Sequence, residues 1–124
     1  RIPAARDQST RVELRCPDPS CNPYLALAVC LAAGLDGIER GLTPPPEISE
    51  NIFSMNSTER ASRGIDNLPG SLEEALEELK KDELIKDTLG EHVFEQFVAG
   101  KEAEWREYCT RVSSWEISKY IIAY

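Results

Sequence analysis

The start of the chain has a pattern typical of β-structure. Val12 and Leu14 alternate with charged neighbours in the segment RVELR, residues 11–15. A period of two predicts a strand with one apolar face. We therefore expect residues 1–16 to form two short extended pieces around a polar turn, as in a β-hairpin. The prolines in residues 17–19 should end it, because proline has no amide hydrogen to donate to a strand ladder.

The next segment, residues 22–40, has the pattern of a buried helix. Asn22 followed by Pro23 predicts its start, since Asn is a favoured cap and Pro is tolerated at the first helical position. From Tyr24 to Leu35 the sequence is apolar almost all round, which is typical of a helix covered on several sides. A chain of 124 residues offers little to cover it. We expect polypeptide outside this chain to do so, and the start at Arg1, without methionine or signal-peptide pattern, likewise predicts a piece of a larger gene product.

The rest of the chain divides into a loop and a helical region. Residues 42–67 hold a triple proline and several Ser and Asn, which predicts a long surface loop with a helix cap at Asn56 and one helical turn. Residues 71–124 carry apolar positions at helical spacing. Two capping boxes are predicted there: Ser71 with Glu74, and Ser113 with Glu116. The expected fold class is α+β and predominantly α-helical: over residues 1–124, a short N-terminal β-hairpin is followed by about four to five helices.

Charge, hydropathy and cysteine spacing narrow the class of protein. The chain carries 22 Asp and Glu against 14 Lys and Arg, a net charge of −8. Nucleic-acid binding needs a concentrated basic face, so no nucleic-acid partner is expected. The most apolar stretch, about 12 residues, is short of the roughly 20 that span a bilayer, so no membrane partner is expected either. The four cysteines lack the usual spacing of a structural zinc site, and we expect free thiols in a cytoplasmic protein, with a disulfide as the weaker alternative.

The RVELR segment is the strongest candidate for chemistry. In an extended chain Arg11, Glu13 and Arg15 lie on one face, about 6.6 Å apart in turn. A carboxylate there suits a divalent cation, and the guanidinium groups suit phosphate or carboxylate oxygens. Phosphoryl transfer uses these parts, because it depends on positioning and on neutralising negative charge. From spacing alone, a solvated ladder of ion pairs explains the same pattern.

The RVELR segment is one of several sequence motifs that follow one another along the chain. Three of them resemble the late active-site signature of glutamine synthetases: Arg1-Ile-Pro, Arg11-Val-Glu-Leu-Arg-Cys-Pro-Asp-Pro and Asn22-Pro-Tyr-Leu-Ala. A fourth, Ala32-Ala-Gly-Leu-Asp-Gly-Ile38, is similar to the helix that follows this signature in the family. Three later ones resemble the type I bacterial branch: Leu68-Pro-Gly-Ser-Leu-Glu-Glu-Ala75, Leu89-Gly-Glu-His-Val-Phe94 and Trp115-Glu. The resemblance covers essentially the whole chain and implies the C-terminal part of the catalytic domain.

The resemblance also implies a reaction and roles in it. The family uses ATP to phosphorylate the side-chain carboxylate of L-glutamate, and ammonia then displaces phosphate from γ-glutamyl phosphate. Carried over, Glu13 would be a catalytic residue and a ligand of Mg²⁺ or Mn²⁺, and Arg15 would hold glutamate and its acyl phosphate. Arg1 and Arg11 would contact the ATP phosphates. The other parts of the site are missing from these 124 residues, so the isolated chain should not catalyse.

The resemblance also implies roles for two further parts of the chain, the C-terminal segment and the loop around Phe53. Type I relatives form a double-ring dodecamer in which the C-terminus docks into the facing ring, and Tyr120, Ile121, Ile122 and Tyr124 would suit such an apolar peg. Packing of this segment on its own domain is the alternative. Phe53 stands where some relatives carry a tyrosine that is adenylylated; it lacks the hydroxyl, and we expect its ring to be buried and to anchor the loop.

Two alternative functions remain open from the sequence. The first is a γ-glutamyl-amide ligase of the same family that takes a polyamine or another amine in place of ammonia. The second is a helical interaction module without catalysis, whose core would be complete without partners.

Overall fold

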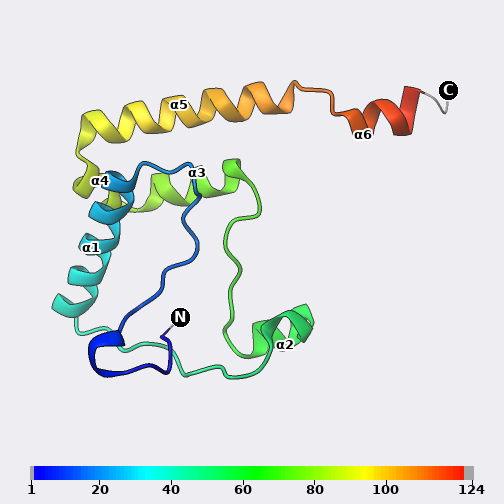
Figure 1. Ribbon diagram of the computed structural model, residues 1–124. Helices are drawn as coiled ribbons and strands as arrows, with labels where there is room; N and C mark the ends of the chain where they lie inside the picture. The colour runs from blue at the N-terminus through cyan, green and yellow to red at the C-terminus, as the bar shows by residue number, and fades with distance from the viewer. Residues whose placement is uncertain (1, 122–124) are drawn as a thin grey trace.

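The fold is a small set of helices joined by long irregular segments (Figure 1). The computed structural model describes residues 2–121. The helices are α1 (Pro23–Glu39), α2 (Ser57–Ser62), α3 (Leu72–Lys81), α4 (Glu83–Leu89), α5 (Glu91–Cys109) and α6 (Ser114–Glu116), which continues into the π-helical turn η3 (Ile117–Ile121). Two 3₁₀ turns, η1 (Asp7–Ser9) and η2 (Ile52–Ser54), lie in the irregular segments. No helix within residues 2–121 is both long and apolar enough to cross a membrane.

The predicted N-terminal hairpin is wrong. Residues 2–121 contain no β-strand, and residues 10–16 follow η1 as irregular chain. Alternation of apolar and polar residues says which side chains share a face, but a strand also needs a neighbour with which to form a hydrogen-bonded ladder. The described chain places no such neighbour beside residues 11–15. In this part of the molecule the fold is therefore all-helical rather than α+β.

The helix starts follow the predicted caps, with one exception. The side chain of Asn22 accepts hydrogen bonds from the amides of Tyr24 and Leu25, which fixes the start of α1. Asn56 caps α2 in a capping box, and Ser113 and Glu116 form the box that opens α6. The box predicted for Ser71 is only half formed. Ser71 accepts from the amide of Glu74, but the Glu74 carboxylate accepts from the amide of Gly70, at 2.7 Å.

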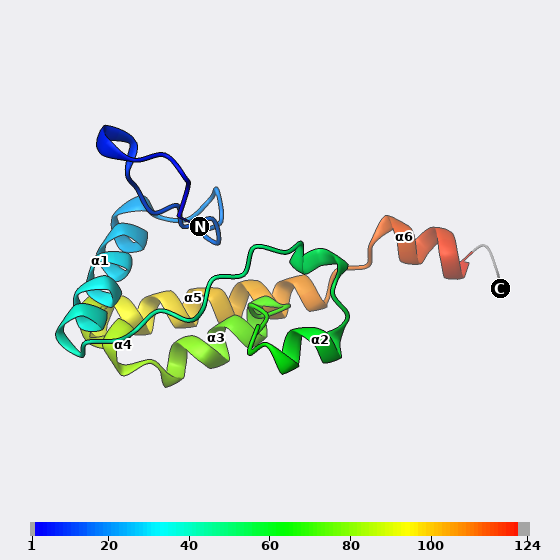
Figure 2. The same ribbon diagram turned by 90° about the horizontal axis from the view of Figure 1, so that it is seen from below.

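Helices α1, α3, α4 and α5 form the packed part of the molecule. Helix α5 runs along α3, α4 joins their ends, and α1 packs on α4 (Figures 1 and 2). Gly90 between α4 and α5 has a φ of 74°, a conformation that glycine adopts without the strain of a side chain. Helix α2 lies apart on the long loop, and α6 extends away from α5 in both views.

The core within the described chain is small. Leu76 of α3, with 4% of its surface exposed, is the one buried large hydrophobic side chain in residues 2–121. Leu72 and Leu79 beside it are partly covered. Helix α1, expected to be buried, has no buried residue here. Stability should therefore depend heavily on a few contacts between α3 and its neighbours.

Leu76→Ala is expected to lower the free energy of unfolding by about 3 kcal/mol, the typical loss when a buried leucine leaves a cavity. A domain with a small core has little stability to spare, so the variant should be largely unfolded at 25 °C. Urea unfolding followed by far-UV circular dichroism measures this. Leu68→Ala is the matched control, because Leu68 is exposed. Equal losses for the two variants would contradict a core centred on Leu76.

An ion pair also links α3 to α5. Lys80 Nζ lies 2.5 Å from Glu102 Oε1. The hydrogen bond from Lys80 lowers the pKa of Glu102 below its ordinary 4.5, and the hydrogen bond to Glu102 raises the pKa of Lys80 above its ordinary 10.5. A carboxyl group whose pKa is lower in the folded protein than in the unfolded chain stabilises the folded state at pH values above its unfolded pKa. This stabilisation is lost as the pH falls through the folded pKa. An ammonium group whose pKa is higher in the folded protein stabilises the folded state at pH values below its unfolded pKa, and this stabilisation is lost as the pH rises through the folded pKa. The ion pair between Lys80 and Glu102 therefore contributes its full stabilisation between about pH 5 and pH 10.

Lys80→Met is expected to lower the melting temperature at about pH 7 and to have little effect at about pH 2, where Glu102 is protonated. The change at neutral pH should be small, because both groups are exposed to solvent. Thermal unfolding at the two pH values measures it. Lys81→Met is the matched control, since Lys81 pairs with Glu78 inside α3, at 2.7 Å. The same shift at both pH values would show that the ion pair is not the cause.

Candidate functional site

Arg11, Glu13 and Arg15 converge on one side of the segment between η1 and α1. Arg11 donates to Glu13 Oε1 from Nε at 3.1 Å and from Nη2 at 2.6 Å. Arg15 donates to the other carboxylate oxygen, Oε2, from Nε at 3.1 Å and also from Nη2. Each oxygen therefore faces one guanidinium group. The predicted shared face exists, although the segment belongs to no sheet.

Local hydrogen bonds hold this segment at both ends. At the start, Arg11 Nη1 donates to the carbonyl oxygen of Ser9 in η1, at 3.1 Å. At the end, the amide and the hydroxyl of Ser20 both donate to Asp18 Oδ1, at 2.6 Å. The hydroxyl, followed by the amide, lowers the pKa of Asp18 below its ordinary 3.8. This turn leads directly to Asn22, the cap of α1, so the start of a regular helix fixes one end of the segment.

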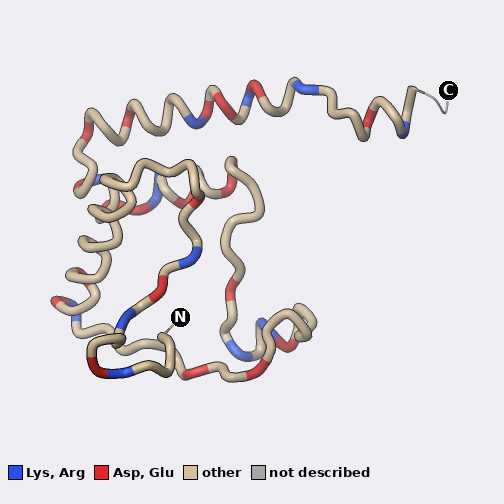
Figure 3. Tube along the Cα trace, viewed as in Figure 1, with Lys and Arg blue, Asp and Glu red and all other residues tan. Residues whose placement is uncertain are grey.

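Exposure separates the carboxylate from the two cations. The Glu13 side chain is 19% exposed, while those of Arg11 and Arg15 are 51% and 65% exposed. The two arginines thus cover the carboxylate and offer their own outer faces to solvent. Figure 3 shows the alternation of positive, negative and positive residues along this segment. An anion approaching from solvent would meet guanidinium groups first, an arrangement suited to phosphate and carboxylate oxygens.

A metal ion at Glu13 would need further ligands. The described residues contain no group of three or more His, Cys, Asp or Glu that could hold a metal ion. Mg²⁺ binds to proteins through one or two carboxylates together with substrate phosphates and water. Glu13 fits such a role as one ligand, provided that one arginine exchanges its hydrogen bonds with the carboxylate for bonds to the substrate. The donor set is thus compatible with the cation but incomplete in these residues.

Of the other residues with predicted roles, some lie outside the described residues and the rest are exposed to solvent. Arg1, Ile122 and Tyr124 lie outside the described residues. Tyr120 and Ile121 are exposed on the projecting C-terminal segment. Phe53 is 99% exposed in η2, so the prediction that its ring is buried and anchors the loop is wrong within the described chain. The apolar pair Ile52-Phe53 predicted burial, but Asn51 instead caps a short turn that presents the ring to solvent.

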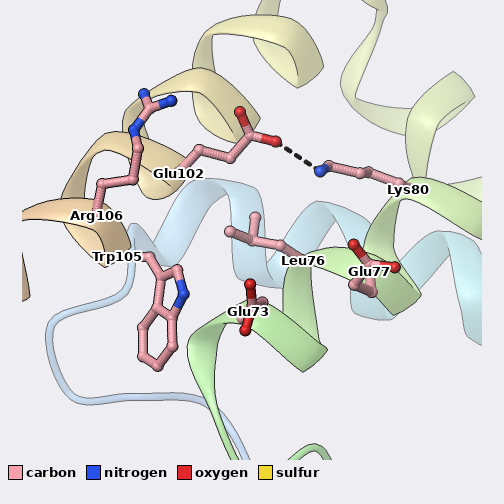
Figure 4. Close-up of a pocket in the computed structure, with 7 residues that line it drawn as sticks. All are labelled: Glu73, Leu76, Glu77, Lys80, Glu102, Trp105 and Arg106. Carbon is pink, nitrogen blue, oxygen red and sulfur yellow. Dashed lines mark hydrogen bonds and ion pairs between the residues drawn. The ribbon is translucent and has the colours of Figure 1, made fainter. Parts of the chain in front are cut away.

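Two of the cavities in the described chain lie between helices, away from this segment, and were not predicted. The smaller, of about 290 Å³, lies between α3 and α5, where Lys80 reaches across to Glu102 (Figure 4). It is lined by Glu73, Leu76, Glu77, Lys80, Glu102, Trp105 and Arg106. The larger, of about 700 Å³, lies between the start of α1 and helices α3, α4 and α5, and neither includes a residue of RVELR. The apolar positions of these helices were predicted to pack in a core, because helical spacing does not reveal where packing is incomplete.

Comparison with known proteins identifies relatives over the whole chain. The sequence pattern of the family "Glutamine synthetase, catalytic domain" matches residues 1–120. The chain is 56% identical over 124 residues to the glutamine synthetase of Clostridium saccharobutylicum, and also 56% identical over 124 residues to that of Thermus thermophilus. It is 55% identical over 121 residues to that of Thermotoga maritima. The matches cover 98–100% of this chain but 28% of the length of each of these three relatives.

Proposed function

This chain belongs to the glutamine synthetase family, in its catalytic domain, and from that premise we propose that it supplies one wall of an active site that ligates ammonia to L-glutamate. The reaction consumes ATP and passes through γ-glutamyl phosphate. The family uses ATP and divalent metal ions, which agrees with a site built from a carboxylate and guanidinium groups. The convergence of Arg11 and Arg15 on Glu13 is the observation that carries the proposal.

The proposed roles follow from the chemistry of each side chain. Glu13 binds Mg²⁺ or Mn²⁺, whose chemistry is to neutralise the phosphate charge that develops during transfer. Arg15 holds the glutamate carboxylate and its acyl phosphate, because a planar guanidinium matches two oxygens at once. Arg11 contacts the ATP phosphates from the other side of Glu13. Arg1 has the same proposed role through its side-chain type and its motif.

The rest of the site is proposed to come from polypeptide outside this chain. The chain spans 28% of the length of its relatives, and one carboxylate does not complete a magnesium site. We accordingly propose that the isolated chain is inactive and that the whole protein works in the cytoplasm. The double-ring dodecamer is proposed for the whole protein as well, with the projecting segment that ends in Tyr120 and Ile121 as the peg between rings. Its exposure and apolar character support that role.

An assay of the full-length protein tests the proposed reaction. We expect ATP-dependent formation of glutamine from glutamate and ammonia, and no formation by residues 1–124 alone. A parallel panel of larger amines separates ammonia ligation from the polyamine alternative. Preference for an amine over ammonia would overturn the proposed acceptor. Turnover by the isolated chain would overturn the proposal that the site needs other polypeptide.

A non-catalytic module is disfavoured because its core would have to be complete, whereas residues 2–121 bury one large hydrophobic side chain.

A further inference from the structure

The link between the RVELR segment and helix α1 is short and stiff. It consists of residues 16–21, and Asp18 stands between its two prolines, Pro17 and Pro19. Proline fixes its own φ near about −65° and restricts the residue before it to extended conformations. The link therefore has few accessible backbone conformations, and its two ends keep a nearly constant relation to each other.

Asp18 closes this link into a hydrogen-bonded turn. The amide of Cys21 donates to the main-chain carbonyl oxygen of Asp18, at 3.0 Å. Turns of this kind favour Asp or Asn in the first position and Pro in the second, as found here. The Asp18 side chain adds two bonds, since Oδ1 accepts from the amide and the hydroxyl of Ser20, each at 2.6 Å. The next residue, Asn22, caps α1. The turn is therefore continuous with the start of the helix.

The turn also faces helix α5. Asp18 and Ser20 line the cavity of about 700 Å³ together with Lys101 and Glu104 of α5. Glu104 holds the Lys101 side chain on the helix, with Nζ 2.6 Å from Oε2. The hydroxyl and the amide of Ser20 lower the pKa of Asp18, and the positive charge of Lys101 lowers it further. The turn is thus tied to α1 through the chain and attracted to α5 by charge.

The RVELR segment depends on its ends for its position. Residues 2–121 contain no β-strand, so within them no ladder fixes the segment. The hydrogen bonds of Arg11 and Arg15 to Glu13 set the geometry of these three groups relative to one another. They do not set where the group lies in the molecule. Catalytic groups have to be held within about 0.5 Å of the productive geometry, and a misplacement of about 1 Å costs about 100-fold in rate.

We propose that Asp18 is a positioning residue that holds Glu13 and Arg15 in place for the ligation reaction, by fixing the turn between them and α1. This inference rests on the proposed function. Asp18 acts through the turn and makes no contact with the substrate. The acceptor oxygen of its side chain should therefore matter more than its charge.

Replacing Asp18 in a full-length protein that carries this segment tests the role. Asp18→Ala removes both side-chain bonds to Ser20, and kcat for glutamine formation should fall about tenfold, part of the cost of a full misplacement. KM for glutamate should change by less than about threefold, because every group that binds substrate is still present. Asp18→Asn keeps an oxygen that accepts from the same two donors, and kcat should return to within about threefold of the wild-type value. Equal losses in the two variants would overturn the proposal, because the carboxylate itself would then act in the reaction.

Hydrogen exchange of residues 11–21, measured by mass spectrometry on the same proteins, reports on the segment independently of activity. Asp18→Ala should exchange about tenfold faster there, roughly the net effect of two hydrogen bonds, and Asp18→Asn should exchange like the wild type. Asp82→Ala is the matched control, because Asp82 Oδ1 also accepts from a backbone amide, that of Ile85, at 3.1 Å. It should speed exchange in α4 and leave both kcat and the exchange of residues 11–21 unchanged.

The two measurements distinguish a failure of this inference from a failure of the proposed function. Unchanged exchange of residues 11–21 in Asp18→Ala would overturn the inference, and so would faster exchange with wild-type kcat. A wild-type protein that forms no glutamine would overturn the proposed function, while exchange would still decide whether Asp18 holds the segment. If Asp18→Ala does not fold, Ser20→Ala takes its place, since it removes only the hydroxyl bond. It should lower kcat and speed exchange about threefold each, and no change in either would overturn the inference.

Discussion

Replacing Glu13 by alanine in a full-length protein that carries this segment is expected to lower kcat for ATP-dependent glutamine formation about 1000-fold. Removal of one preorganised electrostatic group from an active site costs roughly 100- to 1000-fold, and here a proposed metal ligand would be lost as well. The loss would also leave Arg11 and Arg15, which both donate to this carboxylate, facing each other without it. Steady-state kinetics at saturating ATP and glutamate measure the effect.

Assembly should survive this substitution. Glu13 lies in an irregular segment whose neighbours are exposed, and it takes no part in the packing of α1 and α3 to α5. Size-exclusion chromatography checks the assembly. Glu50→Ala is the matched control, because Glu50 is an exposed carboxylate that also pairs with an arginine, Arg63, at 2.8 Å. It should change kcat by less than about twofold, the usual scale for an exposed ion pair. Wild-type turnover of the Glu13 variant would show that the proposed metal role is wrong.

Local sequence signals predicted the helices well because their causes are local. Asn22 followed by Pro23 fixes the start of α1 through hydrogen bonds that span three residues. Ser113 and Glu116 do the same for α6. The helical spacing of apolar positions in residues 71–124 likewise agrees with α3, whose Leu76 is buried.

Features that depend on distant polypeptide could not be predicted in the same way. The hairpin failed because a strand is defined by its partner, and none lies beside residues 11–15 in the described chain. Burial of Phe53 was inferred from its apolar character, yet burial depends on what surrounds a side chain. Alternation did predict that Arg11 and Arg15 share a face with Glu13, because that needs only an extended backbone.

Arg15→Lys provides the sharper test of the site, since it keeps the charge and changes the geometry. Arg15 donates from both Nε and Nη2 to one oxygen of Glu13, and the same planar fork is proposed to hold the glutamate carboxylate and its acyl phosphate. Lysine offers a single ammonium group on a flexible stem and cannot reproduce a two-point contact. We expect kcat/KM for glutamate to fall about 100-fold in the full-length protein.

The division of this loss between kcat and KM identifies the step at which Arg15 acts. An arginine that holds only ground-state glutamate would raise KM and leave kcat unchanged, whereas contact with the acyl phosphate would lower kcat as well. Because γ-glutamyl phosphate carries more negative charge than glutamate, we expect the larger part of the loss in kcat. Arg111→Lys is the matched control, since Arg111 is also exposed and paired with a carboxylate, that of Glu107 on α5. If the two lysine variants behave alike, Arg15 contributes charge to the surface of the protein and has no part in binding glutamate.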